Sequence, residues 1–258
     1  KPEIYFHLGK DFLGEIIKNK VKKLKLKTKI FYHQEATTFS VIILPPSKER
    51  IIFVHRGKLS EFKINELNKV KINPFFYITP GNTPALNFFK FFKKIRNKVK
   101  FIAINPSKKF LEEKLAKKTL SFVDFVFLND EELRILNQNF KKDLILLGKK
   151  TLEEIKVKAL VVTLGEKGSL VFTENQILKA GVIKPQKLVD KTGAGDAFAS
   201  AFFGKIVIEK EFNENVLKSA LLWGSANASS VIQKIGAQNG ILNKEEYQRY
   251  SHLEIKKI

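Results

Sequence analysis

Short apolar runs alternate along the chain with longer segments in which apolar residues recur every three or four positions. The runs are rich in β-branched and aromatic residues, which is typical of strands. The longer segments have the period of an amphipathic helix. We expect strands at 75–78, 101–104, 123–128 and 160–164, and helices at 86–95, at 110–118, from near Asp130, after Asp196 and at 216–232. This alternation predicts a parallel sheet covered by helices on both faces.

The first sixty residues have a different pattern. In chain order we expect a helix around 11–20, a basic connector at 21–29, a strand-like run from Ile30 and two apolar runs at 39–44 and 51–54. The polar sequence at 45–50 begins Pro-Pro-Ser and is typical of a hairpin turn. We therefore expect a hairpin around residues 37–56 that forms part of a lid. A second hairpin is expected where Gly165 to Gly168 joins 160–164 to the apolar run 169–172.

Composition is that of an ordinary globular protein, with 258 residues, 44% hydrophobic and 28% charged. This length suits one domain over residues 1–258, and no flexible linker or low-complexity tract divides it. No apolar run approaches the roughly 18 residues of a membrane-spanning helix. The chain has no cysteine, which excludes a thiolate metal site and fits a cytoplasmic protein. The four histidines lie far apart in the sequence, so we interpret them as surface or loop residues and expect no histidine metal site.

The formal net charge of +21 raises the question of a nucleic-acid partner. Only five of the 47 basic residues are arginine, however, and the lysines spread along most of the chain. Bidentate contacts to phosphate and guanine favour arginine. A nucleic-acid partner is therefore the weaker interpretation, and solvated lysine-rich faces are the simpler one.

The most informative segment is 189–203, where two glycines precede an apolar helical pattern. Gly193 and Gly195 allow backbone conformations that let the amides of residues 193–196 point at one spot as the helix begins. Such a helix start binds phosphate. Asp196 stands beside it and could take a proton from a hydroxyl. The plainer alternative is a turn with Asp196 as the helix N-cap.

This segment resembles the signature of the ribokinase-like (PfkB) carbohydrate kinase family, whose members carry Asp-Thr-Thr-Gly-Ala-Gly-Asp-Ala-Phe. The present chain has Lys191 at the first of the two threonine positions. The resemblance implies an α/β three-layer sandwich with a mostly parallel central sheet and a small β lid. It also implies an ATP- and Mg²⁺-dependent phosphotransferase that acts on a hydroxyl of a sugar, sugar phosphate or nucleoside. Asp196 would be the general base, and the backbone of Gly193, Ala194 and Gly195 would form the anion hole.

Two more segments match the family in its own order. Thr163, Gly165 and Gly168 look like its Thr-x-Gly-x-x-Gly turn, which in relatives lines the nucleotide phosphates and ribose. A plain hairpin turn is the alternative. Asn129 and Glu132 match its Asn-x-x-Glu element, in which the glutamate acts through magnesium-bound water. The alternative there is a helix start rich in acids.

Further residues are implied by the resemblance alone. Asn227 and Gly236 resemble the adenine-side helix and the loop after it, although a small-residue helix face packed on the sheet is as simple an account. Relatives often hold a monovalent cation such as K⁺ beside the anion hole, where Asp190 and the backbone near Gly236 would match. Regions that approach the acceptor in relatives correspond here to Gly57, Gly81 and Asn82.

The resemblance runs from Leu8-Gly9-Lys10-Asp11-Phe12-Leu13-Gly14, similar to the family's Val-Gly-x-Asp-x-x-Gly, to Gly236. Family members carry a sugar-contacting segment upstream of that match, and this chain begins after it. The acceptor is therefore not predicted. Lids of relatives often pair, so a homodimer through the lid is compatible with the sequence.

Other kinase classes lack their markers in this chain. The sequence Gly148-Lys149-Lys150-Thr151 has Asp143 where the first glycine of a P-loop would stand, and no protein-kinase catalytic loop occurs. The alternative function is a catalytically silent family member that binds a nucleotide or RNA.

Overall fold

The computed structural model describes residues 2–43, 51–55 and 61–258. The turn expected at 45–50 and Gly57 lie outside these residues. In chain order the elements are β1 (Glu3–Gly9), α1 (Phe12–Lys23), β2 (Lys27–His33), β3 (Phe39–Ile43), β4 (Ile51–His55), α2 (Ile64–Leu67), β5 (Phe75–Ile78), α3 (Ala85–Ile95), η1 (Arg96–Lys98), β6 (Phe101–Ile104), α4 (Lys108–Leu111), α5 (Ala116–Leu120), β7 (Phe125–Asn129), α6 (Asp130–Asn137), α7 (Leu144–Ile155), β8 (Ala159–Thr163), η2 (Gly165–Lys167), β9 (Ser169–Phe172), β10 (Ile177–Ala180), α8 (Ala194–Glu209), α9 (Glu214–Val231), η3 (Glu246–Arg249) and β11 (Ile255–Lys257).

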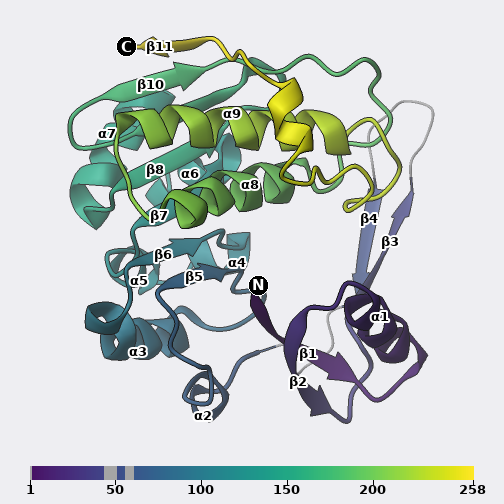
Figure 1. Cartoon of the computed structure of the whole chain (residues 1–258). Coiled ribbons are helices and arrows are strands. Elements are labelled where there is room, and N and C mark those ends of the chain that lie inside the picture. Colours follow the sequence, from purple (N-terminus) through teal and green to yellow (C-terminus); the bar gives the residue numbers. More distant parts are fainter. Residues whose placement is uncertain (1, 44–50, 56–60) are drawn as a thin grey trace.

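The central sheet has seven strands in the order β11-β10-β9-β8-β7-β6-β5. Strands β5 to β8 are parallel, and β8 to β11 pair antiparallel. Helices cover both faces, with α8 and α9 together on one of them (Figure 1). The mostly parallel sheet expected from the alternating pattern is confirmed.

Alternate residues of the central strands point to opposite faces, as the pleat of a strand requires. Ile102 and Ile104 of β6 pack with α3 to α7, whereas Phe101 and Ala103 pack with α8 and α9. Strands covered on both faces need apolar residues at every position. This is why the apolar run at 101–104 predicted the bounds of β6 correctly.

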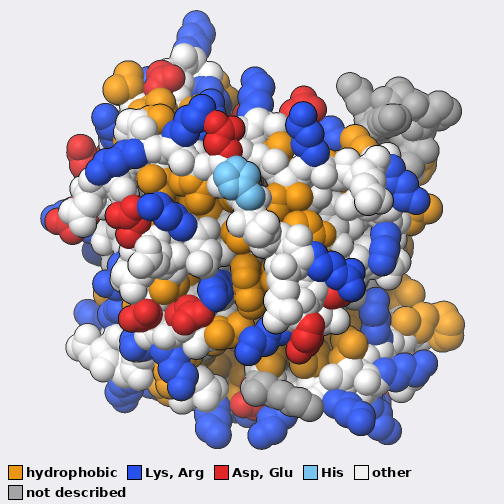
Figure 2. All heavy atoms as spheres, turned by 45° about the horizontal axis from the view of Figure 1, so that its top comes forward, with side chains coloured by type: hydrophobic (Ala, Val, Ile, Leu, Met, Phe, Trp, Pro, Cys, Tyr) orange, Lys and Arg blue, Asp and Glu red, His pale blue; other side chains and the backbone are white. Residues whose placement is uncertain are grey.

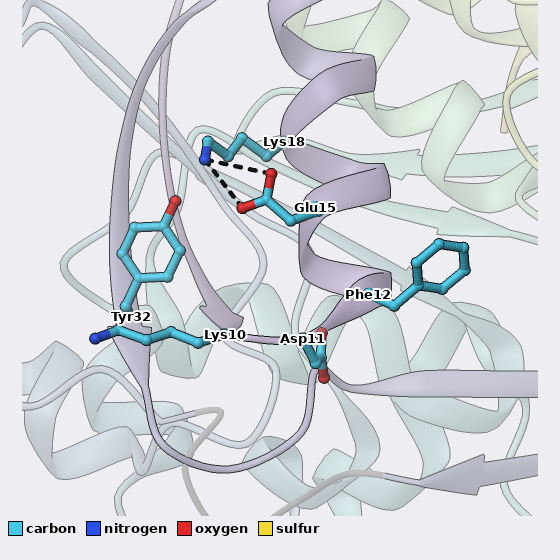
Figure 3. A pocket seen from close by; sticks show the side chains of 6 residues that line it. All are labelled: Lys10, Asp11, Phe12, Glu15, Lys18 and Tyr32. Carbon is cyan, nitrogen blue, oxygen red and sulfur yellow. Dashed lines mark hydrogen bonds and ion pairs between the residues drawn. The ribbon is translucent and has the colours of Figure 1, made fainter.

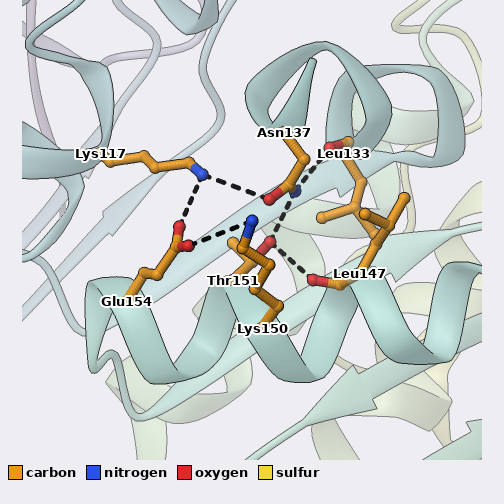
Figure 4. Close-up of polar contacts among 7 residues, drawn as sticks. All are labelled: Lys117, Leu133, Asn137, Leu147, Lys150, Thr151 and Glu154. Atoms are coloured by element: carbon orange, nitrogen blue, oxygen red, sulfur yellow. Dashed lines mark hydrogen bonds and ion pairs between the residues drawn. The ribbon is translucent and has the colours of Figure 1, made fainter. Parts of the chain in front are cut away.

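A buried polar network joins α6 to α7 (Figure 4). The side-chain amide of Asn137 donates to the hydroxyl of Thr151 at 2.7 Å, and Thr151 donates to the carbonyl of Leu147. Lys117 of α5 reaches both Asn137 and Glu154 at the rim of this network. Helix α7 was not predicted from the sequence. Gly148 lies inside α7 rather than at a turn after a strand, which agrees with the absence of a P-loop.

A small parallel sheet, β1 with β2, carries α1. Asp11 is the N-cap of α1, accepts from the Gly14 amide at 2.7 Å, and also binds the amide and hydroxyl of the buried Thr37. A Cβ on Gly9 would lie 2.5 Å from the carbonyl oxygen of Glu35. The residues of the pattern Gly9-x-Asp11-x-x-Gly14 therefore have a structural role, because their contacts fix the position at which α1 begins.

Several expectations for the first 120 residues need correction. Strand β1 was not predicted, and the basic connector is shorter than expected because α1 runs to Lys23 and β2 begins at Lys27. The helix expected at 110–118 is two short helices, α4 and α5. The break includes Glu113, whose carboxylate accepts a hydrogen bond from the Ala85 amide at the start of α3.

The expected hairpin is confirmed as β3 paired antiparallel with β4. All ten of its residues are exposed, and eight of them are large and apolar. It stands apart from the central sheet (Figure 1).

The interpretation of the histidines as separate surface residues is wrong for two of them. His7 and His33 lie on the paired strands β1 and β2, with ring centroids 6.2 Å apart. The His7 side chain is only 8% exposed and forms a hydrogen bond of 3.1 Å with Glu66.

Lysine and arginine side chains are scattered over the face in Figure 2, with acidic and apolar groups among them. On this face the basic side chains do not form a single patch. None of the helices in residues 2–43, 51–55 and 61–258 is both long and apolar enough to span a membrane.

Candidate active site

The carboxyl ends of the parallel strands meet at one edge of the central sheet. Asn129 ends β7 and is the register partner of Thr163, which ends β8. Ile78 of β5 pairs with Ile104 of β6, so the segment after β6 lies at the same edge. Ligand sites of open α/β sheets form at this edge.

Helix α8 begins at this edge. Gly193 is its N-cap, with φ 79° in the left-handed region, and its carbonyl accepts from the Ala197 amide at 2.8 Å. Because the cap is a glycine, no side chain closes the helix start. The Ala194 amide donates to the carbonyl of Lys191 at 3.3 Å, so one of the amides expected in the anion hole is used within the turn. Asp196 is the third helical residue, and the alternative in which it is the N-cap is therefore wrong.

Gly193 and Gly195 serve different purposes. A Cβ on Gly193 would lie 2.6 Å from the Cβ of Ala237, so this glycine lets two loops approach each other. A Cβ on Gly195 would have no heavy atom within 4 Å among the described residues. The space beside Gly195 is therefore open at the start of α8.

The carboxylate of Asp196 is held by an amide from another element. Oδ1 of Asp196 accepts from Nδ2 of Asn105 at 2.8 Å, and Asn105 directly follows β6. Burial raises the pKa of Asp196, and the hydrogen bond from Asn105 lowers it in part. Asp196 is an exposed residue, so its carboxyl group stays accessible to solvent although the surrounding protein atoms raise its pKa.

Glu132 lies on α6, within electrostatic reach of Asp196. Glu132 and Asn129 form a capping box, with both bonds at 2.8 Å. Burial is the main cause that raises the pKa of Glu132, while the Asn129 amide and Lys108 lower it. The expected Asn-x-x-Glu element thus places a partly buried carboxyl group beside the base candidate.

The turn after β8 has two glycines with positive φ, Gly165 at 61° and Gly168 at 88°. A Cβ on Gly168 would collide with the carbonyl oxygen of Ala180, so this glycine is required by the packing of the hairpin. Gly165 faces open space among the described residues. The hydroxyl of Thr163 donates to the carbonyl of Leu128 at 3.4 Å.

Asp190 ties the loop after α9 to the segment before α8. Its two carboxylate oxygens accept from the amides of Thr192 at 2.8 Å and Gly236 at 3.0 Å. Gly236 has φ 89°. The expected pair of Asp190 and Gly236 is therefore brought together next to the start of α8.

Asn227 is 2% exposed and lies inside the protein. Its amide donates to the carbonyl of Ala197 at 2.8 Å and accepts from the Leu242 amide at 3.0 Å. The side chain therefore holds α9 against the first turns of α8.

Gly81 lies beside the segment that carries Asn105. Its φ is 59°, and its carbonyl accepts from the hydroxyl of Ser107 at 2.7 Å. Asn82 follows it and is half-buried. The third residue expected near the acceptor, Gly57, is outside the described residues.

Two residues at this edge were not predicted from the sequence. Asn105 contacts Asp196, and the hydroxyl of Tyr77 on β5 is buried without a hydrogen-bond partner among the described residues. Burial and the charge of Asp196 raise the pKa of Tyr77. The available signal was their position near the ends of β5 and β6, where a parallel sheet gathers its functional groups.

Two open hollows lie elsewhere on the surface. One is lined by Lys10, Asp11, Phe12, Glu15, Lys18 and Tyr32 beside the start of α1, where Lys18 and Glu15 form an ion pair (Figure 3). The other is lined by Lys187, Val189, Gln233, Lys234, Ile235, Gln238, Asn239 and Gly240, next to the Asp190 and Gly236 contact. Neither includes Asp196. Among the described residues, no group of three or more His, Asp or Glu side chains could hold a metal ion.

Comparison with known proteins gives a consistent result. The family model for pfkB family carbohydrate kinases matches residues 3–244. A nucleoside kinase from Methanocaldococcus jannaschii is 28% identical over 245 residues, which cover 93% of this chain and 76% of that protein. A ribokinase from Lactococcus lactis is 30% identical over 261 residues, covering 96% of this chain and 79% of that protein.

Solved structures share the fold at lower identity. Ribokinase from Giardia lamblia superposes with a TM-score of 0.82 at 18% identity, covering 96% of this chain and 82% of that one. Fructokinase from Vibrio cholerae, in a form with fructose, ADP and calcium ion bound, gives a TM-score of 0.79 at 17% identity and covers 96% of this chain and 84% of that one. The expected ribokinase-like sandwich is confirmed.

Proposed function

Because the chain belongs to the pfkB family of carbohydrate kinases, we propose that it transfers the γ-phosphoryl group of ATP to a hydroxyl of a sugar, sugar phosphate or nucleoside. It is a carbohydrate or nucleoside kinase by family and by its relatives. One observation carries the proposal: Asp196 lies in the first turn of α8, beside a helix start that Gly193 leaves without a side-chain cap.

Asp196 is the general base of the proposed reaction. As the acceptor hydroxyl oxygen forms its bond to the γ-phosphorus, the bond from that phosphorus to the bridging oxygen breaks and ADP leaves. The hydroxyl proton passes to Asp196. Such proton transfer contributes roughly 10²- to 10⁴-fold to a rate. The surrounding protein atoms raise the pKa of Asp196, which makes it a better proton acceptor than an aspartate of ordinary pKa.

The start of α8 stabilises the transferring group in this proposal. Phosphoryl transfer spreads negative charge over oxygens, and the N-terminal amides of a helix are suited to hold it. Gly195 supports this role because its side of the helix start is open. Gly193 and Ala194 shape the turn that presents these amides.

The nucleotide would bind along the edge between the β8 turn and the loop after α9. Thr163, Gly165 and Gly168 would face the phosphates and ribose, and Gly236 would lie on the adenine side. Asn227 would act by holding α9 in place, since its amide is used inside the protein.

Mg²⁺ would neutralise charge on the phosphates. Magnesium binds oxygen ligands and keeps several waters, so the ATP phosphates and one or two carboxylates suffice. Glu132, with Asn129 at the same helix start, fits a role through bound water because its carboxyl group lies near Asp196. Asp190 and the backbone near Gly236 would hold K⁺.

We also propose that residues 1–258 form one kinase domain with β3 and β4 as its lid. Gly81 and Asn82, together with Gly57, would approach the acceptor. Large apolar side chains exposed on a two-stranded hairpin favour burial against a second surface. Phe53 is 60% and Ile51 is 52% exposed, and pairing of two such lids would give a homodimer.

The test is ADP release from ATP and Mg²⁺ with a panel of sugars, sugar phosphates and nucleosides. We expect turnover with at least one acceptor and none when Mg²⁺ is chelated. Tight ATP binding without turnover for every acceptor would instead favour a catalytically silent nucleotide-binding protein. RNA binding that persists at physiological salt would instead favour a catalytically silent protein that binds RNA.

A further inference from the structure

We propose that Asn105 is a positioning residue that fixes the carboxylate of Asp196 for proton transfer and keeps one of its oxygens free for the acceptor. This inference rests on the proposed function, in which Asp196 is the base. Asn105 directly follows β6 and Asp196 lies in α8, 91 positions further along the chain, so the contact exists only in the folded protein.

The backbone holds Asn105 in place before its side chain acts. The Asn105 amide donates to the carbonyl of Ile78 at 2.9 Å, which extends the pairing of β5 with β6 by one residue. Pro106 follows, and a residue before proline is restricted to extended conformations. The side chain of Asn105 therefore leaves a rigid strand end in a defined direction.

The hydrogen bond uses one side of the carboxylate only. Nδ2 of Asn105 donates to Oδ1 of Asp196, and no other hydrogen bond to this carboxylate is present within the described residues. An amide nitrogen donates but does not accept protons. Oδ1 is thus oriented without competing for the transferred proton, and Oδ2 is left to receive it.

The hydroxyl of Tyr77 supports this arrangement from β5. It is shielded from solvent and lies close enough to Asn105 for a hydrogen bond with that side chain to lower the pKa of Tyr77, although no hydrogen bond of standard geometry to the hydroxyl is present among the described residues. Buried hydroxyls normally have a partner, and one that lacks it calls for an explanation. A hydrogen bond from Tyr77 to the amide oxygen of Asn105 would complete a chain from Tyr77 through Asn105 to Asp196.

The hydrogen bond from Asn105 also affects protonation. It lowers the pKa of Asp196 against the effect of burial. The charge of Asp196 in turn raises the pKa of Tyr77 on β5 and of Glu132 on α6. Removing the Asn105 amide should therefore raise the pKa of Asp196, which a loss of packing alone would not do.

The experiment compares two variants at this position with a matched control. Asn105→Leu keeps the size of the side chain and removes the donor, and Asn105→Asp keeps the shape but adds a second carboxylate. Asn87→Ala is the control, because Asn87 also donates through its amide, to the carbonyl of Phe62 at 2.9 Å, but on α3. The acceptor found by the panel and ATP are each varied at a saturating concentration of the other, and kcat and both KM values are measured from pH 5 to 9.

We expect kcat of Asn105→Leu to fall about 10- to 100-fold, as for a misplaced reacting group, with KM for ATP unchanged. The acidic limb of the kcat profile should move to higher pH in both variants, more in Asn105→Asp. An NMR titration of ¹³C-labelled aspartate carboxyls should show the same rise for Asp196 without any turnover. Asn87→Ala should leave both profiles unchanged.

The inference would be overturned if folded Asn105→Leu and Asn105→Asp kept the wild-type kcat and acidic limb. It would also fail if both lost activity with no change in the Asp196 titration, since that result indicates a purely structural role. Failure of the proposed function is a separate outcome: wild-type protein would then show no turnover with any acceptor, while the NMR titration would still test the contact.

Discussion

Gly193 and Ala237 touch where the start of α8 meets the loop after α9. A Cβ added to Gly193 would lie 2.6 Å from the Cβ of Ala237, closer than such atoms approach in proteins. Asp190 ties the same two segments through the Gly236 amide. The glycine before the helix is therefore required by packing, and the glycine two residues later is not.

Gly193→Ala should destabilise the protein. The residue would need a left-handed φ, which costs about 1–2 kcal/mol for a residue with a Cβ, and it would also collide with Ala237. A loss of about 2–3 kcal/mol should lower Tm by roughly 4–12 °C. Thermal unfolding followed by circular dichroism measures the change, and an unchanged Tm would show that the loop yields without cost.

Gly195→Ala should act on activity rather than stability. The added methyl has open space among the described residues, and alanine favours a helix over glycine by about 1 kcal/mol, so Tm should stay level or rise. If the transferring phosphoryl group lies beside Gly195, the methyl should lower kcat/KM by about 10- to 100-fold. Wild-type kinetics in a stable Gly195→Ala protein would place the anion hole elsewhere.

The pH dependence of activity should follow Asp196. Burial raises its pKa above that of an ordinary aspartate, and the base must be ionised to accept a proton. Activity should therefore be present above this raised pKa and fall as the pH drops through it. A kcat profile whose acidic limb lies at the pKa of an ordinary aspartate would contradict this effect of burial on Asp196.

The raised pKa values of Asp196 and Glu132 make the folded protein less stable as the pH rises, whereas activity increases with pH. Between the ordinary carboxyl pKa and the raised values, the folded protein binds more protons at Asp196 and Glu132 than the unfolded chain does. The extra bound protons thus stabilise the folded state at pH values below this window. This stabilisation is lost as the pH rises through the raised pKa values. Asp196→Asn with Glu132→Gln should flatten this part of the curve from urea unfolding at several pH values.

Tyr77→Phe should separate stability from activity. The variant removes a buried hydroxyl that has no hydrogen bond of standard geometry among the described residues but that interacts with Asn105, so the protein should be stabilised by no more than about 1 kcal/mol. If the hydroxyl orients Asn105 during the reaction, kcat should fall several-fold in the same variant. Equal activity with a higher Tm would limit Tyr77 to a packing role.

The sequence pattern was most informative where strands are covered on both faces. The runs at 75–78 and 101–104 coincide with β5 and β6 because every position of such strands is apolar. The pattern failed where distant contacts decide the local structure. The helix expected at 110–118 is interrupted around Glu113, whose carboxylate accepts a hydrogen bond from the Ala85 amide. No local signal in the sequence reveals that partner.

The candidate site shows the same limit. The glycines around Asp196 predicted that a helix begins there, and α8 does begin at Ala194; its anion binding stays a prediction. The contact between Asn105 and Asp196 spans 91 positions and depends on the order of β5 to β8 in the sheet. Asp190 and Gly236 were paired only by resemblance, and their hydrogen bond of 3.0 Å gives that pairing a physical basis.

The most direct test of the account is kcat of Asp196→Asn for the acceptor that the wild-type protein phosphorylates, with the dissociation constant for ATP measured in parallel. The asparagine keeps the shape of the side chain and the neutral contact to Asn105, but it cannot take a proton. We predict a loss of about 10²- to 10⁴-fold in kcat with ATP affinity retained. Phosphorylation at the wild-type rate by a folded Asp196→Asn protein would contradict the assignment of Asp196 as the base.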